Sequence, residues 1–159
     1  MISLLLSFFF LAAPPVSPTP EEAYTAERIE RLRRLEGTQV ELFGNPQGPN
    51  AEGKVEKVWQ LKFVTPSTPG GFEAVLTEGW RGTPVPEVPR VAPLTFKLTM
   101  EFGPCGSAHL KGTATERPEV SIEIISHKTR MCEDLPANDM LATVQHGKTA
   151  TKLYQAPDR

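Results

Sequence analysis

Residues 94–102 have the sequence Leu94-Thr95-Phe96-Lys97-Leu98-Thr99-Met100-Glu101-Phe102. Every second side chain is apolar, and the residues between them are threonine, lysine or glutamate. Since successive side chains of a strand point to opposite faces of a sheet, this alternation predicts a strand with one buried face. Such a strand needs neighbours, and antiparallel sheets are the ones that bury one face and leave the other in water.

The same period of two recurs on both sides of this strand. It predicts six further strands, at residues 38–43, 55–64, 72–77, 108–115, 120–126 and 149–155. The chain also contains 16 prolines and 12 glycines, which favour many turns and few long helices. We therefore expect a mainly antiparallel β-sheet, either a small barrel or a strongly curved sheet.

Two segments have helical spacing instead. Thr19 is expected to cap a helix that begins at Pro20, has Glu22 in a capping box and ends at Gly37. A short second helix is expected to begin at Pro136 and to end at Gly147, because its apolar residues recur at positions i, i+3, i+4 and i+7. These residues are Ala137, Met140, Leu141 and Val144. The expected fold class is therefore α+β.

The N-terminus predicts export. Residues 1–20 contain no Asp, Glu, Lys or Arg, and residues 2–13 are apolar apart from Ser3 and Ser7. A membrane-spanning helix needs roughly twenty apolar residues, so this shorter run favours a signal peptide, followed by a proline-rich tether up to residue 20. A retained N-terminal anchor and a buried apolar segment are the alternatives. We expect a periplasmic or secreted protein with no stable membrane span.

The overall charge gives no reason to expect a nucleic-acid partner. The chain has 17 basic and 19 acidic side chains, for a formal net charge of −2. A nucleic-acid-binding domain would be expected to carry a basic patch. The expected partner is instead an envelope or secreted protein.

Export also determines the interpretation of the two cysteines, Cys105 and Cys132. Thiols in an oxidising compartment are expected to pair, so the sequence predicts one structural disulfide. Closing this loop would stabilise the folded state by about 3.5 kcal/mol in the chain-entropy account. Two buried free thiols are the alternative, whereas a redox pair lacks the Cys-x-x-Cys spacing that lowers a thiol pKa.

Five segments after residue 71 follow the order of a known family pattern. An apolar strand precedes a glycine-containing loop, a core strand that begins with proline, a cysteine with a glycine-containing stretch, and a Met-Cys segment. They are Ala74-Val75-Leu76-Thr77, Gly82-Thr83-Pro84-Val85, Pro93-Leu94-Thr95-Phe96, Cys105-Gly106-Ser107-Ala108-His109-Leu110-Lys111-Gly112 and Thr129-Arg130-Met131-Cys132. On these residues the chain resembles the META domain family of HslJ-like heat-shock proteins. Gly106 stands where that family has an asparagine, so no role of the asparagine is carried over.

The resemblance implies a division of the chain. Residues 72–155 would be the META-like β domain, residues 21–71 an added helix and β-hairpin, and residues 156–159 a tail. In a second register, Leu35-Glu36-Gly37-Thr38-Gln39-Val40-Glu41-Leu42 is the opening segment of the family and residues are inserted before the core strand. The family is linked to envelope stress and secretion rather than to a reaction.

The reactive side chains do not form a pattern typical of catalysis. Cys105 and His109 lie four residues apart, but no third group orients the histidine and no oxyanion hole is evident. A zinc site needs three or four ligands, and His127 and His146 lie in unrelated contexts. Residues 103–107 lack the Gly-Lys-Ser/Thr ending of a phosphate loop. We expect no enzyme, no metal and no cofactor.

The candidate binding loop lies within residues 80–93. Its candidate contact residues are Trp80, Arg81, Val85, Pro86 and Val88. The four prolines of this segment would pre-extend its valines and lower the entropy cost of binding. Such a loop could present a strand to a partner or to a protease cleft. The alternative is a stiff connector that covers a sheet edge.

Three functions follow from these observations. The first is an exported, non-enzymatic META-like module for binding or folding assistance in envelope stress or secretion. The second is a secreted protease inhibitor that uses the segment 80–93. The third is a barrel-type carrier of a small ligand, which rests only on the number of strands.

Overall fold

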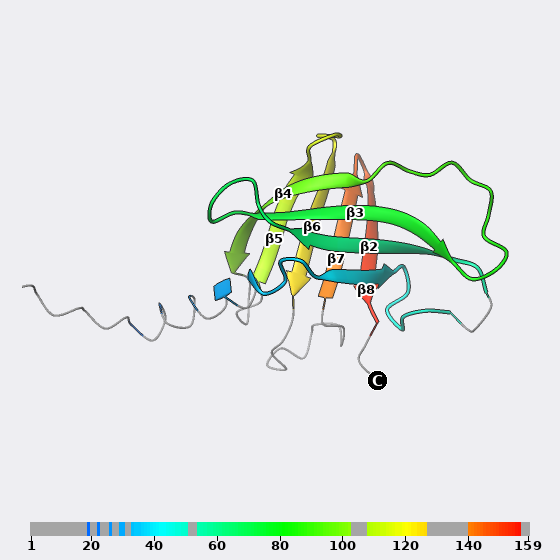
Figure 1. The fold of residues 1–159 in the computed structure, drawn as a ribbon, viewed down its shortest axis with the longest axis horizontal. Helices are drawn as coiled ribbons and strands as arrows, with labels where there is room; N and C mark the ends of the chain where they lie inside the picture. The colour runs from blue at the N-terminus through cyan, green and yellow to red at the C-terminus, as the bar shows by residue number, and fades with distance from the viewer. Residues whose placement is uncertain are drawn as a thin grey trace, which may run out of the picture.

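The computed structural model describes residues 19, 22, 26, 29, 30, 33–50, 54–102, 108–126 and 140–156. These described residues form eight strands, which Figure 1 draws as arrows. They are β1 (Gln39–Phe43), β2 (Glu56–Val64), β3 (Phe72–Arg81), β4 (Leu94–Phe102), β5 (Ala108–Ala114), β6 (Val120–Ser126), β7 (Met140–His146) and β8 (Thr149–Gln155).

The strands form a closed antiparallel barrel. Each strand pairs with the next one along the chain, and β1 pairs with β8 to complete the ring. This result confirms the expected antiparallel sheet in its barrel form. The seven strands predicted from period-two patterns are all present, and β4 has the predicted bounds.

One face of every strand lines the interior. Paired residues of neighbouring strands point to the same side, so the register carries one inward face around the ring. The largest fully buried side chains all lie on that face. They are Phe96, Leu42, Leu61, Leu110, Ile124 and Leu153. The middle of the barrel is therefore a packed core, as an eight-stranded barrel allows.

The strand β3 is longer than the sequence predicted. It continues past Thr77 to Arg81, and Gly79 lies in the ladder opposite Val58 of β2. The prediction that residues 80–93 form a loop was therefore wrong at its start, because Trp80 and Arg81 belong to β3. The proline loop, residues 82–93, begins only after Arg81 and connects β3 to β4 (Figure 1).

The short helix predicted near the C-terminus is wrong over its described part. Met140–His146 is the strand β7, which pairs with β6 and β8. Met140, Ala142 and Val144 also satisfy a period of two, and the two neighbouring strands decide between the periods. Gly147, predicted to end a helix, lies at φ +57° in the short connection between His146 and Thr149.

The N-terminal helix is not supported, because the described part of the chain contains no continuous helix. Its predicted cap is present: the Glu22 N–H donates to Thr19 Oγ1 (3.2 Å), and the Thr19 N–H donates to Glu22 Oε2 (2.8 Å). Glu22, Ala26, Ile29, Glu30 and Arg33 have helical backbone. The residues between them lie outside the described ranges.

A turn after Arg33 closes one end of the barrel. The Gly37 N–H donates to the Phe63 carbonyl (2.9 Å), and the Phe63 N–H donates to the Thr38 carbonyl (3.0 Å). Leu35 packs against the buried core from this turn. Gly37 has φ +80°, a conformation that favours glycine.

The predicted boundary between residues 71 and 72 does not separate two folded units. It falls in the turn between β2 and β3, whose residues pair from Val64↔Glu73 to Glu56↔Arg81. Both β1 and β2 are strands of the same barrel as β3 to β8. Strands from the predicted extension and from the predicted META-like domain therefore share one core.

Candidate functional site

A groove lies between the end of β3 and the proline loop. It has a volume of about 950 Å³. From β3 it is lined by Thr77, Glu78, Gly79 and Trp80, and from β2 by Lys57. The proline loop supplies the other wall, with Val85, Pro86, Val88, Pro89, Arg90, Val91, Ala92 and Pro93. We refer to this feature as the loop groove.

The loop groove collects exposed apolar side chains. Trp80 is 38% exposed, Val85 56%, and Val88 and Val91 48% each. These are the large hydrophobic side chains that lie exposed among the described residues, and all of them line the loop groove. An exposed apolar patch rimmed by polar groups is typical of an interaction surface. The structure thus brings together Trp80, Val85, Pro86 and Val88 from the predicted binding loop.

Arg81, the fifth predicted residue, does not line the loop groove. Its Nη1 donates a hydrogen bond to Glu41 Oε2 (3.1 Å). Adjacent side chains of a strand point to opposite faces, so Arg81 lies on the outer face and Trp80 on the inner one. Arg81 is therefore the last residue of β3 rather than part of the loop groove, and its role in binding stays a prediction.

A charged pair that the sequence analysis missed lies where the loop groove meets the barrel interior. Lys57 Nζ forms an ion pair with Glu78 Oε2, and it also lies 5.2 Å from the centre of the Trp59 ring. Lys57 and Glu78 come from β2 and β3 and lie on the inward face near Trp80, which pairs with Lys57. Only the β2–β3 register brings them together.

Lys57 and Glu78 also line a small cavity at the end of the barrel, which we call the mouth cavity and which has a volume of about 120 Å³. Its walls are inward residues of β2, β3, β4, β7 and β8, and the proline loop contributes Val91 and Ala92. Pockets for drug-sized ligands are typically about 300–1,000 Å³. The mouth cavity is therefore too small for such a ligand.

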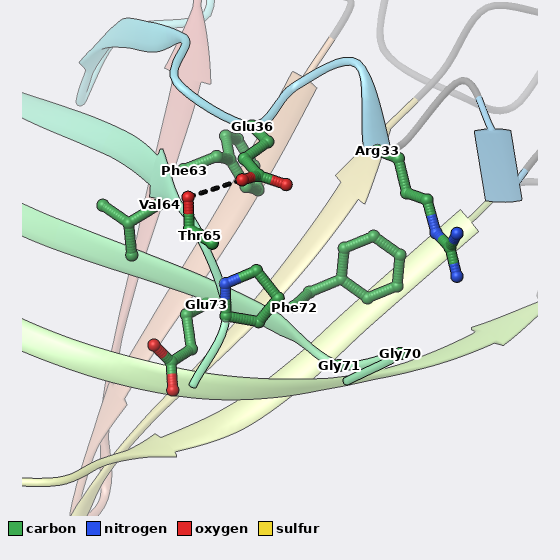
Figure 2. Close-up of a pocket in the computed structure, with 10 residues that line it drawn as sticks. Arg33, Glu36, Phe63, Val64, Thr65, Gly70, Gly71, Phe72 and Glu73 are labelled. Carbon is green, nitrogen blue, oxygen red and sulfur yellow. Dashed lines mark hydrogen bonds between the residues drawn. The ribbon is translucent and has the colours of Figure 1, made fainter. Parts of the chain in front are cut away.

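A second depression lies at the opposite ends of β2 and β3. Figure 2 shows this crease, which has a volume of about 270 Å³ and lies between the turn after Arg33 and the β2–β3 turn. Across it, Thr65 Oγ1 donates a hydrogen bond to Glu36 Oε1 (2.5 Å) (Figure 2). Ser67 Oγ likewise donates to Glu73 Oε1 (2.5 Å). The carboxylates of Glu36 and Glu73 thus bind hydroxyls of the protein itself, which indicates that the crease is a contact between two turns.

A charge network covers the outer face of β4, β5 and β6. Lys111 Nζ lies 2.8 Å from Glu101 Oε2 and 3.7 Å from Glu123 Oε1, and His109 Nδ1 lies 3.0 Å from Glu123 Oε1. The hydrogen bond between Lys111 and Glu101 raises the pKa of Lys111 and lowers the pKa of Glu101. Glu101, Lys111 and Glu123 are exposed, and ion pairs between exposed side chains stabilise a protein little, whereas His109 is partly buried.

The predicted disulfide residues, Cys105 and Cys132, lie outside the described residues. Within the described ranges, no cluster of three His, Cys, Asp or Glu side chains could hold a metal ion. Among the described residues, no helix is long and apolar enough to cross a membrane.

No protein-family model, curated protein or solved structure matches this chain.

Proposed function

We propose that this chain is an exported, non-enzymatic binding module that holds an apolar segment of a partner protein in the loop groove. One observation carries the proposal: Trp80, Val85, Val88 and Val91 leave their apolar surfaces exposed and line the same groove. Exposed aromatic and aliphatic side chains gathered in one depression are typical of a protein-binding surface.

The barrel interior offers less for a ligand than the loop groove. Phe96, Leu61 and Leu110 fill its centre and are at most 1% exposed. The space in the mouth is about 120 Å³, against about 950 Å³ for the loop groove. These volumes favour a site outside the core, and the small-ligand carrier has correspondingly less support.

The charges of the loop groove restrict its partner. Lys57 and Glu78 neutralise each other as an ion pair. Arg90 makes no ion pair with any residue that the structure describes. A mainly apolar segment that carries a carboxylate would therefore match the groove better than a basic one.

Export and a role in envelope stress or secretion are part of the proposal. Export rests on the uncharged apolar N-terminus, and the role rests on the resemblance to the META domain family. The absence of a catalytic arrangement in the sequence supports a binding role.

The alternative, a protease inhibitor, has less support from the geometry. An inhibitory loop must project its side chains into the cleft of the protease. Here Val85, Pro86 and Val88 form one wall of a concave groove. This arrangement favours a loop that receives a segment over a loop that is inserted.

The proposal is tested with a permanently unfolded polypeptide. Fluorescein-labelled lactalbumin, reduced and carboxymethylated, is titrated with the exported protein, and anisotropy gives the Kd. Combining Trp80→Ser, Val85→Ser and Val88→Ser should raise the Kd at least about tenfold, because such anchors carry most of the binding energy.

Val75→Ser is the matched control, since Val75 is an apolar residue on the outer face of the same strand. Circular dichroism establishes that both variants are folded. Equal Kd values for the wild type and the groove variant, or no binding by the wild type, would contradict the proposal.

A further inference from the structure

The strand β3 is paired unequally on its two sides. It pairs with β2 from Glu73 to Arg81, but with β4 only from Phe72 to Leu76. Among the described residues, the stretch from Thr77 to Arg81 therefore has a β-neighbour on one side and none on the other. The side without a neighbour faces the loop groove, whose lining includes Thr77 to Trp80.

The ladder identifies which backbone groups are free. In an antiparallel sheet, the N–H and C=O of one residue point to the same neighbouring strand, and successive residues alternate. The Thr115 N–H donates to the Thr95 carbonyl (2.7 Å), so the backbone groups of Thr95 point to β5 and those of Leu94 point to β3. Leu76 pairs with Leu94, so the backbone groups of Leu76 point to β4. By alternation, the backbone groups of Glu78 and Trp80 point to the same side as those of Leu76.

The proline loop does not fill this edge. Among the described residues, no backbone hydrogen bond joins residues 82–93 to Glu78 or Trp80. The four prolines of the loop fix their own φ near about −65°, which opposes continuation of a regular β-ladder. The N–H and C=O groups of both residues are thus available along one wall of the loop groove.

We propose that the partner segment binds as an added strand along Glu78–Trp80, which rests on the proposed function of the loop groove. The partner is an extended peptide with alternating apolar side chains and one carboxylate. Its backbone exchanges hydrogen bonds with Glu78 and Trp80, and strand addition of this kind gives affinity from the main chain. Its apolar side chains pack between Trp80 and Val88, and Arg90 receives its carboxylate.

The charge and size of the site fit this occupant. Arg90 lines the groove and makes no ion pair with the described residues, so a carboxylate of the partner would complement its charge. The groove, at about 950 Å³, has room for an extended segment beside β3. A second copy of this chain, paired edge to edge through β3, is the competing occupant and is resolved by the same experiment.

The experiment follows amide hydrogen exchange by NMR in the whole exported protein. The probe is a synthetic peptide of roughly seven residues, the length of an ordinary strand, with alternating valine and threonine and one aspartate. At saturation, exchange at the Glu78 and Trp80 amides should slow at least about tenfold, while exchange at the Gly79 amide, already paired with β2, should hardly change.

Two control peptides carry N-methyl groups on alternate residues. One peptide is methylated along one edge of the bound strand, and the other along the opposite edge. Strand addition requires that at least one of them bind at least about tenfold more weakly than the parent peptide. The inference is overturned if the parent peptide fails to bind, if it binds without slowing exchange at Glu78 and Trp80, or if both methylated peptides bind as tightly as the parent peptide.

These failures differ from failure of the proposed function. If carboxymethylated lactalbumin still binds and responds to the groove substitutions, the groove function stands and only strand addition is wrong. Slow, concentration-dependent exchange at Glu78 and Trp80 without peptide would identify a second copy on the edge and would also overturn the inference.

Discussion

Leu76 and Leu94 form the last paired position between β3 and β4, and β3 continues beyond it while β4 gives way to the proline loop. This one register position separates the closed part of the barrel from a segment of β3 that has a neighbour on one side only. The free edge and the loop groove both begin there.

The unequal pairing predicts an alternating pattern of amide exchange in the free protein. Thr77 and Gly79 point to β2, where they pair with Gln60 and Val58. Glu78 and Trp80 point away from it, so their amides are open to water. In NMR hydrogen exchange without any peptide, Glu78 and Trp80 should exchange at least about tenfold faster than Thr77 and Gly79. Uniformly slow exchange along these four residues would show that the edge is covered.

The centre of the barrel should be sensitive to loss of volume. Phe96 is 0% exposed and belongs to the buried core from the inward face of β4. Phe96→Ala should lower the free energy of unfolding by about 3–5 kcal/mol, since it removes buried contacts and leaves a cavity. Urea denaturation measures the change. Val88→Ala, in the exposed proline loop, should change stability by no more than about 0.5 kcal/mol. Similar effects from both substitutions would contradict a packed barrel interior.

Gly112 is required by the close approach of β4 to β5. A Cβ added there would lie 2.1 Å from the Lys97 carbonyl oxygen, a backbone atom that cannot rotate away. Gly112→Ala should therefore destabilise the protein by about 1–3 kcal/mol. Gly79→Ala is the matched control, because Gly79 also lies within a strand and its added Cβ would meet Val58 at 3.8 Å, an ordinary contact. Thermal unfolding of the two variants should separate them clearly.

The strands could be predicted because their side chains alternate between clear turn signals. Leu94–Phe102 and Val120–Ser126 were predicted with the bounds that the structure has. Prediction was wrong for β7 because Met140 and Val144 fit both periods. With Ala142 they have the period of a strand, and with Ala137 and Leu141 that of a helix. Pairing with β6 and β8 decides the outcome, and the local spacing of apolar residues does not reveal that pairing.

The site could be predicted only where its residues are contiguous in the chain. Trp80, Val85 and Val88 stand out in the sequence as apolar residues among prolines. Lys57 and Glu78 have no such signal, because only the β2–β3 register brings them to the groove. The sequence placed Arg81 in a loop, whereas it is the last residue of β3 and its side chain pairs with Glu41.

Acid should destabilise the protein partly through Glu116. The Thr95 backbone N–H donates to its carboxylate (2.8 Å), which lowers the pKa of Glu116 below its ordinary value of 4.5. A depressed pKa in the folded state stabilises the protein above the unfolded pKa, and this contribution is lost as the pH falls through the folded pKa. Urea denaturation from about pH 5 to about pH 3 should therefore show a shallower loss of stability for Glu116→Gln than for the wild type.

The control for this pH experiment is Glu87→Gln. Glu87 lies exposed in the proline loop and makes no hydrogen bond or ion pair with the described residues. Its substitution should leave the acid part of the stability profile unchanged. If Glu116→Gln and the wild type lose stability in parallel, the hydrogen bond to Thr95 does not contribute to acid sensitivity.

The predicted disulfide can be argued from the strands on either side of the two cysteines. Cys105 follows β4 and precedes β5, and Cys132 follows β6 and precedes β7. Ala108, the first residue of β5, pairs with Phe102 and with Ser126, and Ser126 pairs with Met140. The four strand ends that flank the cysteines are thus neighbours at one end of the barrel. This adjacency of the strand ends motivates the predicted bond between Cys105 and Cys132, which lie outside the described residues.

Intact mass of the exported protein, treated with an alkylating reagent before and after reduction, tests this bond. We expect no labelling before reduction and two labels after it. Combining Cys105→Ser with Cys132→Ser should lower the free energy of unfolding by about 3.5 kcal/mol, because the unfolded chain then loses its covalent constraint. The same variant compared with reduced wild-type protein separates this constraint from the packing of the sulfur atoms. Labelling of both thiols in the untreated protein would show that the cysteines are free, and the barrel would then owe its stability to its core alone.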